Sequence, residues 1–302
     1  MHLLLTGGTG FIGQALRDSL LAEGHQLTIL TRQQNLASSD RCRYVNTLDT
    51  LVREAAALDG VINLAGASLA EGRWTRSRRQ VLWDSRVELT RDLVAALQQL
   101  PEPPRILLSG SAVGYYGHPE QSELDESSPP GSGFGSELCQ AWEAAAQEAA
   151  ALGTRVCRLR LGVVLDQGGG ALSQMVLPFR LGVASWPGSG HQVLSWVHRS
   201  DVVSAMQFLL AHPACEGAFN LTAPAPVSQR QLCDALREHF RTWLTLPAPA
   251  PVLRLALGEM ADELLLEGAH VIPAALEDAG FGFGFPQIRD ALAAIYGGGA
   301  PD

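Results

Sequence analysis

The stretch LLLTGGTGFIGQAL, residues 3–16, decides the fold of this chain, because an apolar run leads through a cluster of glycines into a helical pattern. Gly7 lets the chain turn out of a strand, Gly10 lets the backbone approach a pyrophosphate, and Gly13 lets a helix pack closely on a sheet. The helix N-terminus offers free N–H groups to phosphates. The stretch predicts the phosphate turn of a dinucleotide site, with an ordinary glycine-rich turn as the alternative. The expected contacts are Gly7, Thr9, Gly10, Phe11, Ile12 and Gly13.

The next strand pattern, residues 26–32, indicates which dinucleotide the turn holds. A site specific for NAD usually ends this strand in an acidic residue that accepts hydrogen bonds from the ribose. This chain has Thr31 and Arg32 there. An arginine pairs with a 2′-phosphate and stacks on adenine, whereas a carboxylate repels the phosphate. We therefore expect NADP (NADPH) rather than NAD, unless Arg32 is only a solvated loop residue.

Strand and helix patterns alternate along most of the 302 residues. Short apolar runs separated by amphipathic helices are typical of parallel strands covered on both faces. We therefore expect an α/β fold, a Rossmann-type doubly wound parallel sheet built from right-handed crossovers. The expected strands are 2–7, 26–32, 41–46, 60–66, 105–111, 155–165 and 217–222, and the expected helices include 10–25, 51–58, 75–99 and 135–152.

The regular alternation of strand and helix patterns ends after residue 165. A glycine-rich loop (166–174) and an irregular stretch (178–192) precede a short extended piece and a helix over 194–212. Residues 245–252 are proline-rich, and the remainder is mainly helical. We predict an NAD(P)-binding epimerase/dehydratase-like domain over 1–245 and a small helical C-terminal domain over 246–302. Within the first domain, we assign 166–192 and 214–245 to the substrate side.

Composition excludes several functions. The net charge of −9 argues against binding to nucleic acid or an anionic membrane. The arginine cluster at 73–80, RWTRSRRQ, is a local basic patch or, alternatively, a solvated helix face. No apolar run of about 18 residues and no basic leader segment is present, so we expect a cytoplasmic protein without membrane contact.

Cysteine and histidine usage points away from disulfides and metals. The five cysteines are an odd number, and no two have C-x-x-C spacing. Reduced, buried thiols are the expected state. The eight histidines form no H-E-x-x-H motif, so no metal site is expected.

Four segments together resemble the extended short-chain dehydrogenase/reductases, the group that includes nucleotide-sugar epimerases and dehydratases. They are TGGTGFIG, INLAG, SGSAVGYYG and WVHRSD. With CQAWEAAA, LPFRLG, GSGHQ and LGEMADELLLEG, the chain resembles more narrowly the epimerase-family branch, whose members carry a C-terminal domain of unknown function. The resemblance covers nearly the whole chain.

The resemblance implies roles by position. Ser111 matches the active-site serine, and Tyr115 and Tyr116 match the family's YG segment. His198 and its neighbours match a segment that supports the substrate side, although His198 is equally a structural histidine. The residues implied at the cofactor are Leu64, Ala65, Gly66, Arg86, Ser109 and Leu161; those implied on the substrate side are Trp196, His198 and Asp201.

The stretch PFRLGVASWPGSGHQ supplies further substrate-side candidates. Arg180, near Phe179, Trp186 and His191, would suit an anionic or planar ligand, or plain packing.

One family motif is missing. The family usually carries a tyrosine and a lysine four residues apart, on one helix face, and the lysine lowers the tyrosine's pKa for acid–base work. If Glu143 aligns with the family's acidic residue, Gly135 and Cys139 occupy these two positions. Tyr115 or Tyr116 would have to substitute, without a lysine partner.

Two functions therefore stay open. The first is an NADP-dependent oxidoreductase or epimerase-like enzyme with an unusual acid–base group, acting on an unidentified small molecule. The second is a non-catalytic NADP-binding redox sensor or scaffold protein. A protein that has also lost cofactor binding is a weaker third, against which the intact GGTGFIG argues. The alanine-rich stretch 141–152 suits a homodimer interface or a helix face buried within one chain.

Overall fold

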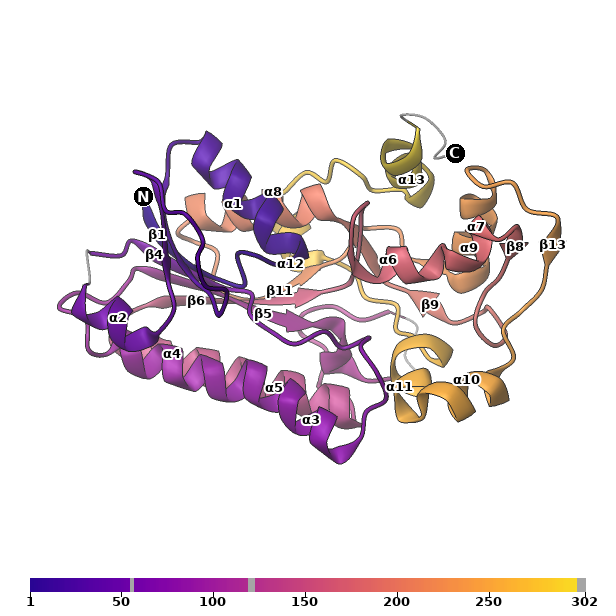
Figure 1. Cartoon of the computed structure of the whole chain (residues 1–302), viewed down its shortest axis with the longest axis horizontal. Helices are drawn as coiled ribbons and strands as arrows, with labels where there is room; N and C mark the ends of the chain where they lie inside the picture. The colour runs from indigo at the N-terminus through magenta and orange to yellow at the C-terminus, as the bar shows by residue number, and fades with distance from the viewer. Residues whose placement is uncertain (55–56, 119–122, 298–302) are drawn as a thin grey trace.

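A twisted parallel sheet forms the centre of the computed structural model, which describes residues 1–54, 57–118 and 123–297 (Figure 1). The strand order is β3-β2-β1-β4-β5-β6-β11, with every neighbouring pair parallel. The seven strands are β1 (His2–Thr6), β2 (Gln26–Leu30), β3 (Cys42–Val45), β4 (Gly60–Asn63), β5 (Ile106–Ala112), β6 (Arg155–Leu161) and β11 (Gly217–Leu221). This confirms the predicted doubly wound Rossmann-type sheet.

The order of the strands reverses beside β1. Strands β2 and β3 follow β1 to one side, and the chain then returns to place β4 on its other side. A crevice for a ligand opens at the carboxyl ends of the strands where such a reversal occurs. The glycine turn lies at this point, directly after β1.

Helices cover both faces of the sheet (Figure 1). Alternate residues of β1 divide between two cores: Leu3 and Leu5 join the core under α1 and α8, while Leu4 joins the core under α2 and α4. One face carries α1 (Phe11–Ala22), α8 (Arg199–Ala211) and α12 (Ala274–Asp278); the other carries α2 (Leu48–Arg53), α3 (Arg76–Trp83), α4 (Leu89–Leu97) and α5 (Phe134–Gln147).

The expected helix over 75–99 is interrupted by a π-helical turn at Asp84–Glu88 between α3 and α4. Single π-turns inside helices often occur at functional sites. This one buries Arg86 beneath the carboxyl edge of the sheet.

Two predicted boundaries are wrong beyond residue 155. The expected single strand over 155–165 splits at Gly162, where the Val163 N–H turns to donate to the Ser195 carbonyl (2.8 Å). The Ser195 backbone passes so close that a Cβ on residue 162 would lie 2.6 Å from its oxygen. The chain leaves the main sheet and continues as β7 (Val163–Leu165), which pairs with β10 (Trp196–His198). The expected loop 166–174 contains α6 (Gly170–Met175), whose Leu172 is buried in a second core.

This second core fills the part of the molecule that the sequence predicts to be the substrate side. It gathers apolar residues from both sides of the predicted boundary at 246, including Leu232 and Leu292. The remaining elements around it are α7 (Leu177–Arg180), β8 (Val183–Ala184), β9 (Val193–Leu194), β12 (Val227–Ser228), α9 (Gln229–Arg237), β13 (Leu244–Thr245) and α13 (Ile288–Tyr296).

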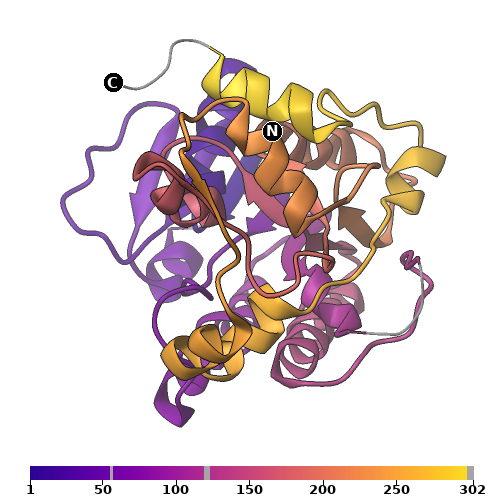
Figure 2. The ribbon, with the colours of Figure 1, turned by 90° about the vertical axis from the view of Figure 1, so that its right-hand side faces the viewer.

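The C-terminal segment, residues 246–297, spreads over the molecule (Figure 2). Its first helices, α10 (Ala250–Leu257) and α11 (Glu259–Ala261), lie at one end of the central cleft, and α13 packs against α9. Between them, the Val271 N–H donates to Ser195 Oγ (2.9 Å), and Asn220 Nδ2 donates to the Ile272 carbonyl (2.8 Å).

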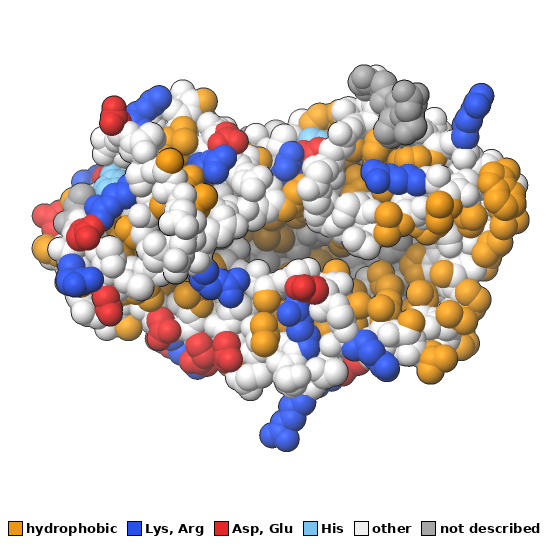
Figure 3. Space-filling model, viewed as in Figure 1, with side chains coloured by type: hydrophobic (Ala, Val, Ile, Leu, Met, Phe, Trp, Pro, Cys, Tyr) orange, Lys and Arg blue, Asp and Glu red, His pale blue; other side chains and the backbone are white. Residues whose placement is uncertain are grey.

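The surface has two notable features. Figure 3 shows a hollow across the middle of the face, between the elements around α6 and those around α3 and α11. Exposed apolar side chains gather at one end, over α7, β13 and α10; they include Leu181, Trp243 and Leu255. Within the described ranges, no helix combines the length and hydrophobicity needed to cross a bilayer.

Candidate functional site

The glycine turn after β1 is a cradle of bare backbone. Gly7 has a φ of +71°, which glycine adopts without strain, and a Cβ there would lie 2.7 Å from the Leu64 carbonyl carbon. A Cβ at Gly13 would lie 2.1 Å from the Gly7 oxygen. Gly10 is exposed at the N-cap of α1. The turn therefore holds its shape only with glycine at positions 7 and 13, and its exposed N-cap leaves the helix N-terminus open to a phosphate.

Phe11 and Ile12 open α1, and Thr9 precedes its N-cap. The Phe11 ring lies against the glycine-rich loop, since a Cβ at Gly169 would lie 2.7 Å from the ring. Arg199 stacks on Phe11 (4.7 Å to the ring centroid) and pairs with Asp166 (2.7 Å). The loop from the substrate side therefore lies directly over the start of the turn.

Arg86 is a buried cation at the end of β4. It is 8 % exposed, and its guanidinium fills the space beside Gly66, where a Cβ would lie 2.9 Å from Cζ. It donates to the Ala67 carbonyl (3.0 Å) and lies 5.3 Å from the Trp142 ring centroid. Burial lowers the pKa of Arg86 to about 10.

No carboxylate pairs with Arg86 within residues 1–54, 57–118 and 123–297. A buried charge without a counter-ion is costly, and an anionic ligand at Gly66 would relieve that cost. Leu64 and Ala65 lie between this arginine and the turn, and the Ala65 N–H donates to Thr6 Oγ1 (3.1 Å).

Thr31 and Arg32 follow β2 at the same edge of the sheet. Thr31 is buried, and its hydroxyl accepts from the Gln33 N–H (3.2 Å). Arg32 is exposed and forms no ion pair with any residue that the structure describes. Its guanidinium is thus available to a ligand that extends from the turn.

Ser111 lies at the end of β5 in a buried charged network. Its hydroxyl donates to Glu143 Oε1 (2.7 Å), and Glu143 accepts a bidentate pair from Arg160 (2.8 and 3.0 Å). Arg160 also donates to the Tyr116 hydroxyl (2.9 Å), which donates to Asn220 Oδ1 (2.7 Å). All five side chains are at most 4 % exposed.

The two candidate tyrosines differ in access. Tyr116 is fully buried, and burial raises its pKa to about 12, which does not suit acid–base work near neutral pH. Tyr115 is half-buried, with Arg160 Cζ stacked 3.5 Å from its ring centroid. Ser109 lies deeper, where its hydroxyl accepts from Asn63 Nδ2 (3.3 Å) inside the sheet.

The helix that would carry the tyrosine and lysine has neither. Gly135 and Cys139 lie one turn apart on α5, and Cys139 is buried with its pKa raised to about 11 by burial. All 22 basic Lys and Arg positions are arginines, so the chain contains no lysine for such a pair. Instead, Glu263 accepts from the Phe134 and Gly135 N–H groups (3.1 and 3.2 Å). Sequence reasoning missed Glu263.

The WVHRSD segment holds the C-terminal segment. Trp196 is buried, and its Nε1 donates to the Ala225 carbonyl (3.0 Å). His198 Nδ1 accepts from the Ser200 N–H (3.2 Å), and its ring lies 4.2 Å from that of Phe285. Asp201 accepts from the Gly284 and Phe285 N–H groups, both at 2.9 Å. These contacts favour the structural alternative for His198.

The other substrate-side candidates are more dispersed. Phe179 is buried in the second core, whereas Arg180 is exposed at the end of α7. Arg230 stacks on Trp186 at 4.9 Å, and His191 is exposed. Leu161 is half-buried where β6 ends.

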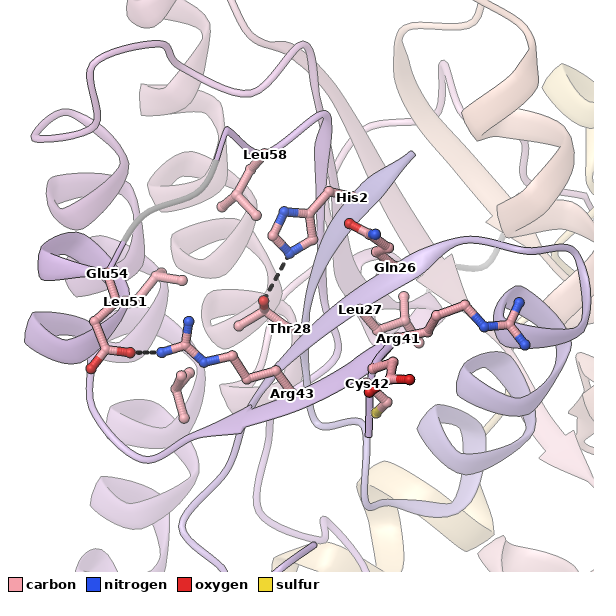
Figure 4. Close-up of a pocket in the computed structure, with 12 residues that line it drawn as sticks. His2, Gln26, Leu27, Thr28, Arg41, Cys42, Arg43, Leu51, Glu54 and Leu58 are labelled. Atoms are coloured by element: carbon pink, nitrogen blue, oxygen red, sulfur yellow. Dashed lines mark hydrogen bonds and ion pairs between the residues drawn. The ribbon is translucent and has the colours of Figure 1, made fainter. Parts of the chain in front are cut away.

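A separate pocket lies at the opposite end of the sheet (Figure 4). It is lined by residues at the starts of β1 and β2 and along β3, including His2, Gln26 and Arg43. His2 Nε2 and the Thr28 hydroxyl share a hydrogen bond of 2.9 Å there. Because open parallel sheets bind ligands at their carboxyl ends, this pocket is not the dinucleotide site.

Two known protein families match successive parts of the chain. Residues 3–221 match the NAD dependent epimerase/dehydratase family, and residues 248–295 match a domain of unknown function (DUF1731). An epimerase family protein of Mycobacterium bovis is 37 % identical over 288 residues, which cover 95 % of each chain. A chloroplastic epimerase family protein SDR39U1 homolog of Arabidopsis thaliana is 35 % identical, covering 98 % of this chain and 86 % of its own.

Solved structures of epimerase family proteins have the same fold as this chain. The human epimerase family protein SDR39U1, crystallised with NADPH, superposes with a TM-score of 0.89 at 33 % identity, covering 99 % of this chain and 100 % of its own. A Thermus thermophilus UDP-glucose 4-epimerase in complex with NAD has a TM-score of 0.76 at 21 % identity, over 99 % and 100 % of the two chains, which supports the fold alone.

Proposed function

This chain belongs to the NAD-dependent epimerase/dehydratase family, and from that premise we propose that it is an NADP-dependent oxidoreductase or epimerase-like enzyme acting on a small molecule. The observation that carries the proposal is the bare backbone cradle at the reversal of strand order, beside Arg86, which pairs with no carboxylate of the described residues. A human relative that binds NADPH supports the same nucleotide here.

The residues fit a dinucleotide in three places. The turn from Gly7 to Gly13 would take the pyrophosphate, because its three spaced glycines let a ligand approach the backbone at the N-terminus of α1. Arg32 would take the 2′-phosphate, since nothing in the described chain neutralises it. Gly66 and Arg86 would border the nicotinamide half of the molecule, which supplies hydride transfer when bound.

The chain's own contribution to the chemistry is electrostatic. Glu143 and Arg160 fix Ser111 at the end of β5, so its hydroxyl is held at one position. Arg86 supplies positive charge from a buried position, where a fixed charge acts strongly on a ligand. The half-buried Tyr115, whose ring is fixed by Arg160, is the more accessible of the two tyrosines.

The experiment that tests the proposal is a fluorescence titration of nucleotide-free protein with NADPH and with NADH. We expect tight binding of NADPH and weaker binding of NADH. The variant Arg32→Gln should weaken NADPH binding by roughly ten- to a hundredfold, the worth of a charge-assisted hydrogen bond, and leave NADH unchanged. Arg53→Gln, an exposed arginine on α2 that carries no proposed ligand contact, is the matched control. Absence of binding of either nucleotide would refute the proposal.

A second candidate function is a non-catalytic NADP-binding sensor or scaffold. The observation that favours it is that α5 carries neither a tyrosine nor a lysine; if Glu143 aligns with the family's acidic residue, Gly135 and Cys139 occupy the two positions. It predicts that bound NADPH stays reduced with every carbonyl compound and sugar nucleotide tried. Sustained, substrate-dependent oxidation of NADPH that is lost in Ser111→Ala would exclude it. A cytoplasmic location fits both candidates, because all five cysteines are buried and free.

A further inference from the structure

The head of α5 receives a carboxylate from a segment more than 120 residues away. Glu263 lies in the π-helical turn Asp262–Leu266 of the C-terminal segment. Its two oxygens accept separately, Oε1 from the Phe134 N–H and Oε2 from the Gly135 N–H. A Cβ at Gly133 would lie 2.5 Å from Oε1, and a Cβ at Gly135 would lie 2.8 Å from Oε2. The carboxylate therefore fills the space where the side chain of residue 135 would begin.

That space belongs to the face of α5 that borders the cleft. Gly135 and Cys139 are one helical turn apart, so they share a face. The Cys139 thiol neighbours the Ser111 hydroxyl and the Arg86 guanidinium. A Cβ at Gly114, in the turn that follows β5, would lie 3.9 Å from Cys139 Sγ and 4.0 Å from the Gly135 oxygen. The face of α5 that carries the Glu263 carboxylate at Gly135 and the Cys139 thiol therefore also borders Ser111.

We propose that Glu263 is a functional residue of the cleft. Its carboxylate places a fixed negative charge at the position where related enzymes carry their acid–base tyrosine. This inference rests on the proposed function, because it concerns the nicotinamide end of the cofactor that we place there. An acid–base tyrosine exchanges a proton with the substrate oxygen, whose carbon exchanges hydride with the nicotinamide ring. A carboxylate at the root of that side chain lies on the same side of the cleft, where its charge acts on the ring through space.

The charge and the free lone pairs of Glu263 indicate what it favours. The nicotinamide ring is cationic in NADP⁺ and neutral in NADPH, so a nearby carboxylate stabilises the oxidised nucleotide. Each carboxylate oxygen uses one lone pair for an N–H and keeps another for a ligand donor. The substrate group that fits such an acceptor is a hydrogen-bond donor, such as a hydroxyl. The site is accordingly suited to a donor-bearing substrate together with NADP⁺.

The test compares the dissociation constants of NADP⁺ and NADPH, which requires no knowledge of the substrate. The variants are Glu263→Gln, which removes the charge, and Glu263→Asp, which keeps it on a shorter side chain. Glu267→Gln is the matched control, an exposed carboxylate four residues along that pairs with His118. We expect Glu263→Gln to shift the ratio of the two constants roughly fivefold toward NADPH, and Glu263→Asp and Glu267→Gln to leave it within about twofold.

The outcomes separate this inference from the proposed function. If Glu263→Gln binds both nucleotides as the natural chain does and only its melting temperature falls, Glu263 is a helix cap and the inference is wrong. If Glu263→Gln does not fold, the ratio of the two dissociation constants is measured in Glu263→Asp at low salt and at 1 M salt. Salt screens the carboxylate, so the preference for NADP⁺ over NADPH must be weaker at 1 M salt. An equal ratio at both salt concentrations would overturn the inference. If the natural chain binds neither nucleotide, the proposed function falls and the inference with it.

Discussion

Gly13 is the residue on which the cofactor turn depends most, because the space of a side chain is already occupied by the Gly7 oxygen, 2.1 Å from a Cβ. Gly13→Ala must push α1 away from the turn. We expect roughly tenfold weaker NADPH binding and a free energy of unfolding lower by about 1–3 kcal/mol. Gly282→Ala is the control, since nothing lies within 4 Å of a Cβ there. Fluorescence titration and urea unfolding measure both effects, and unchanged binding in Gly13→Ala would contradict the cradle.

His198 gives the protein a pH dependence of known sign. Burial lowers its pKa below the ordinary value, so the folded chain favours the neutral ring. The unfolded chain takes up a proton below about pH 6.5, and the free energy of unfolding therefore falls as the pH drops through that value. Above it, this contribution is constant.

The substitution that isolates this effect is His198→Asn. Asparagine keeps an acceptor for the Ser200 N–H at the N-cap of α8 but does not titrate. Urea unfolding at pH 5.5 and 7.5 should show a smaller pH dependence in this variant than in the natural chain. The same dependence in both would assign it to other groups.

Single residues also show what the sequence could and could not predict. The glycine turn was predictable because its three glycines and its strand and helix are contiguous. Glu263 was not, since it meets Gly135 only after the chain has folded across 128 residues. A sequence signal existed: the chain has no lysine, so an acid–base group of an active enzyme has to come from elsewhere in the chain.

At the scale of elements, the pair Glu143 and Arg160 joins α5 to β6, and both side chains are nearly inaccessible. Removing Glu143 leaves the buried Arg160 without the carboxylate that it pairs with. We expect Glu143→Gln to lower the free energy of unfolding by about 3–5 kcal/mol. The double variant Glu143→Met with Arg160→Met should cost less than the sum of its single variants, because it removes both charges. Urea unfolding of the natural chain, Glu143→Met, Arg160→Met and the double variant measures this coupling. Strictly additive losses of free energy would argue against it.

At the same scale, the local sequence pattern predicted which segments are helices and which are strands. The wrong boundaries lie where contacts between residues distant in sequence decide where an element ends. Periodicity predicted the helices of 10–25 and 135–152, whose apolar residues face the sheet. The division of 155–165 at Gly162 depends on the approach of Ser195, which is remote in sequence. The alanines of α5 illustrate the same limit: Ala145 and Ala146 are buried within this chain, so the intrachain alternative accounts for them.

For the whole molecule, the question is whether residues 246–302 form a unit of their own. The C-terminal segment crosses the substrate side and contributes Ile288, Leu292 and Ile295 to a core shared with Leu232 and Leu236 of α9. It also supplies two N–H donors to Asp201 and the carboxylate at the head of α5. A core completed from both parts ties their folding together.

Truncation after Thr245 tests this dependence. The shortened chain loses Ile288, Ala291, Leu292 and Ile295 from the second core, which exposes the apolar residues packed with them. We therefore expect no cooperative unfolding transition and strong binding of a hydrophobic dye. Truncation after Gly297 is the control, since it keeps α13 and every contact named above. Circular dichroism during urea unfolding distinguishes the two. A shortened chain that unfolds as cooperatively as the control, and still binds NADPH, would mean that residues 1–245 fold independently and that the C-terminal segment is an appendage to the cofactor site.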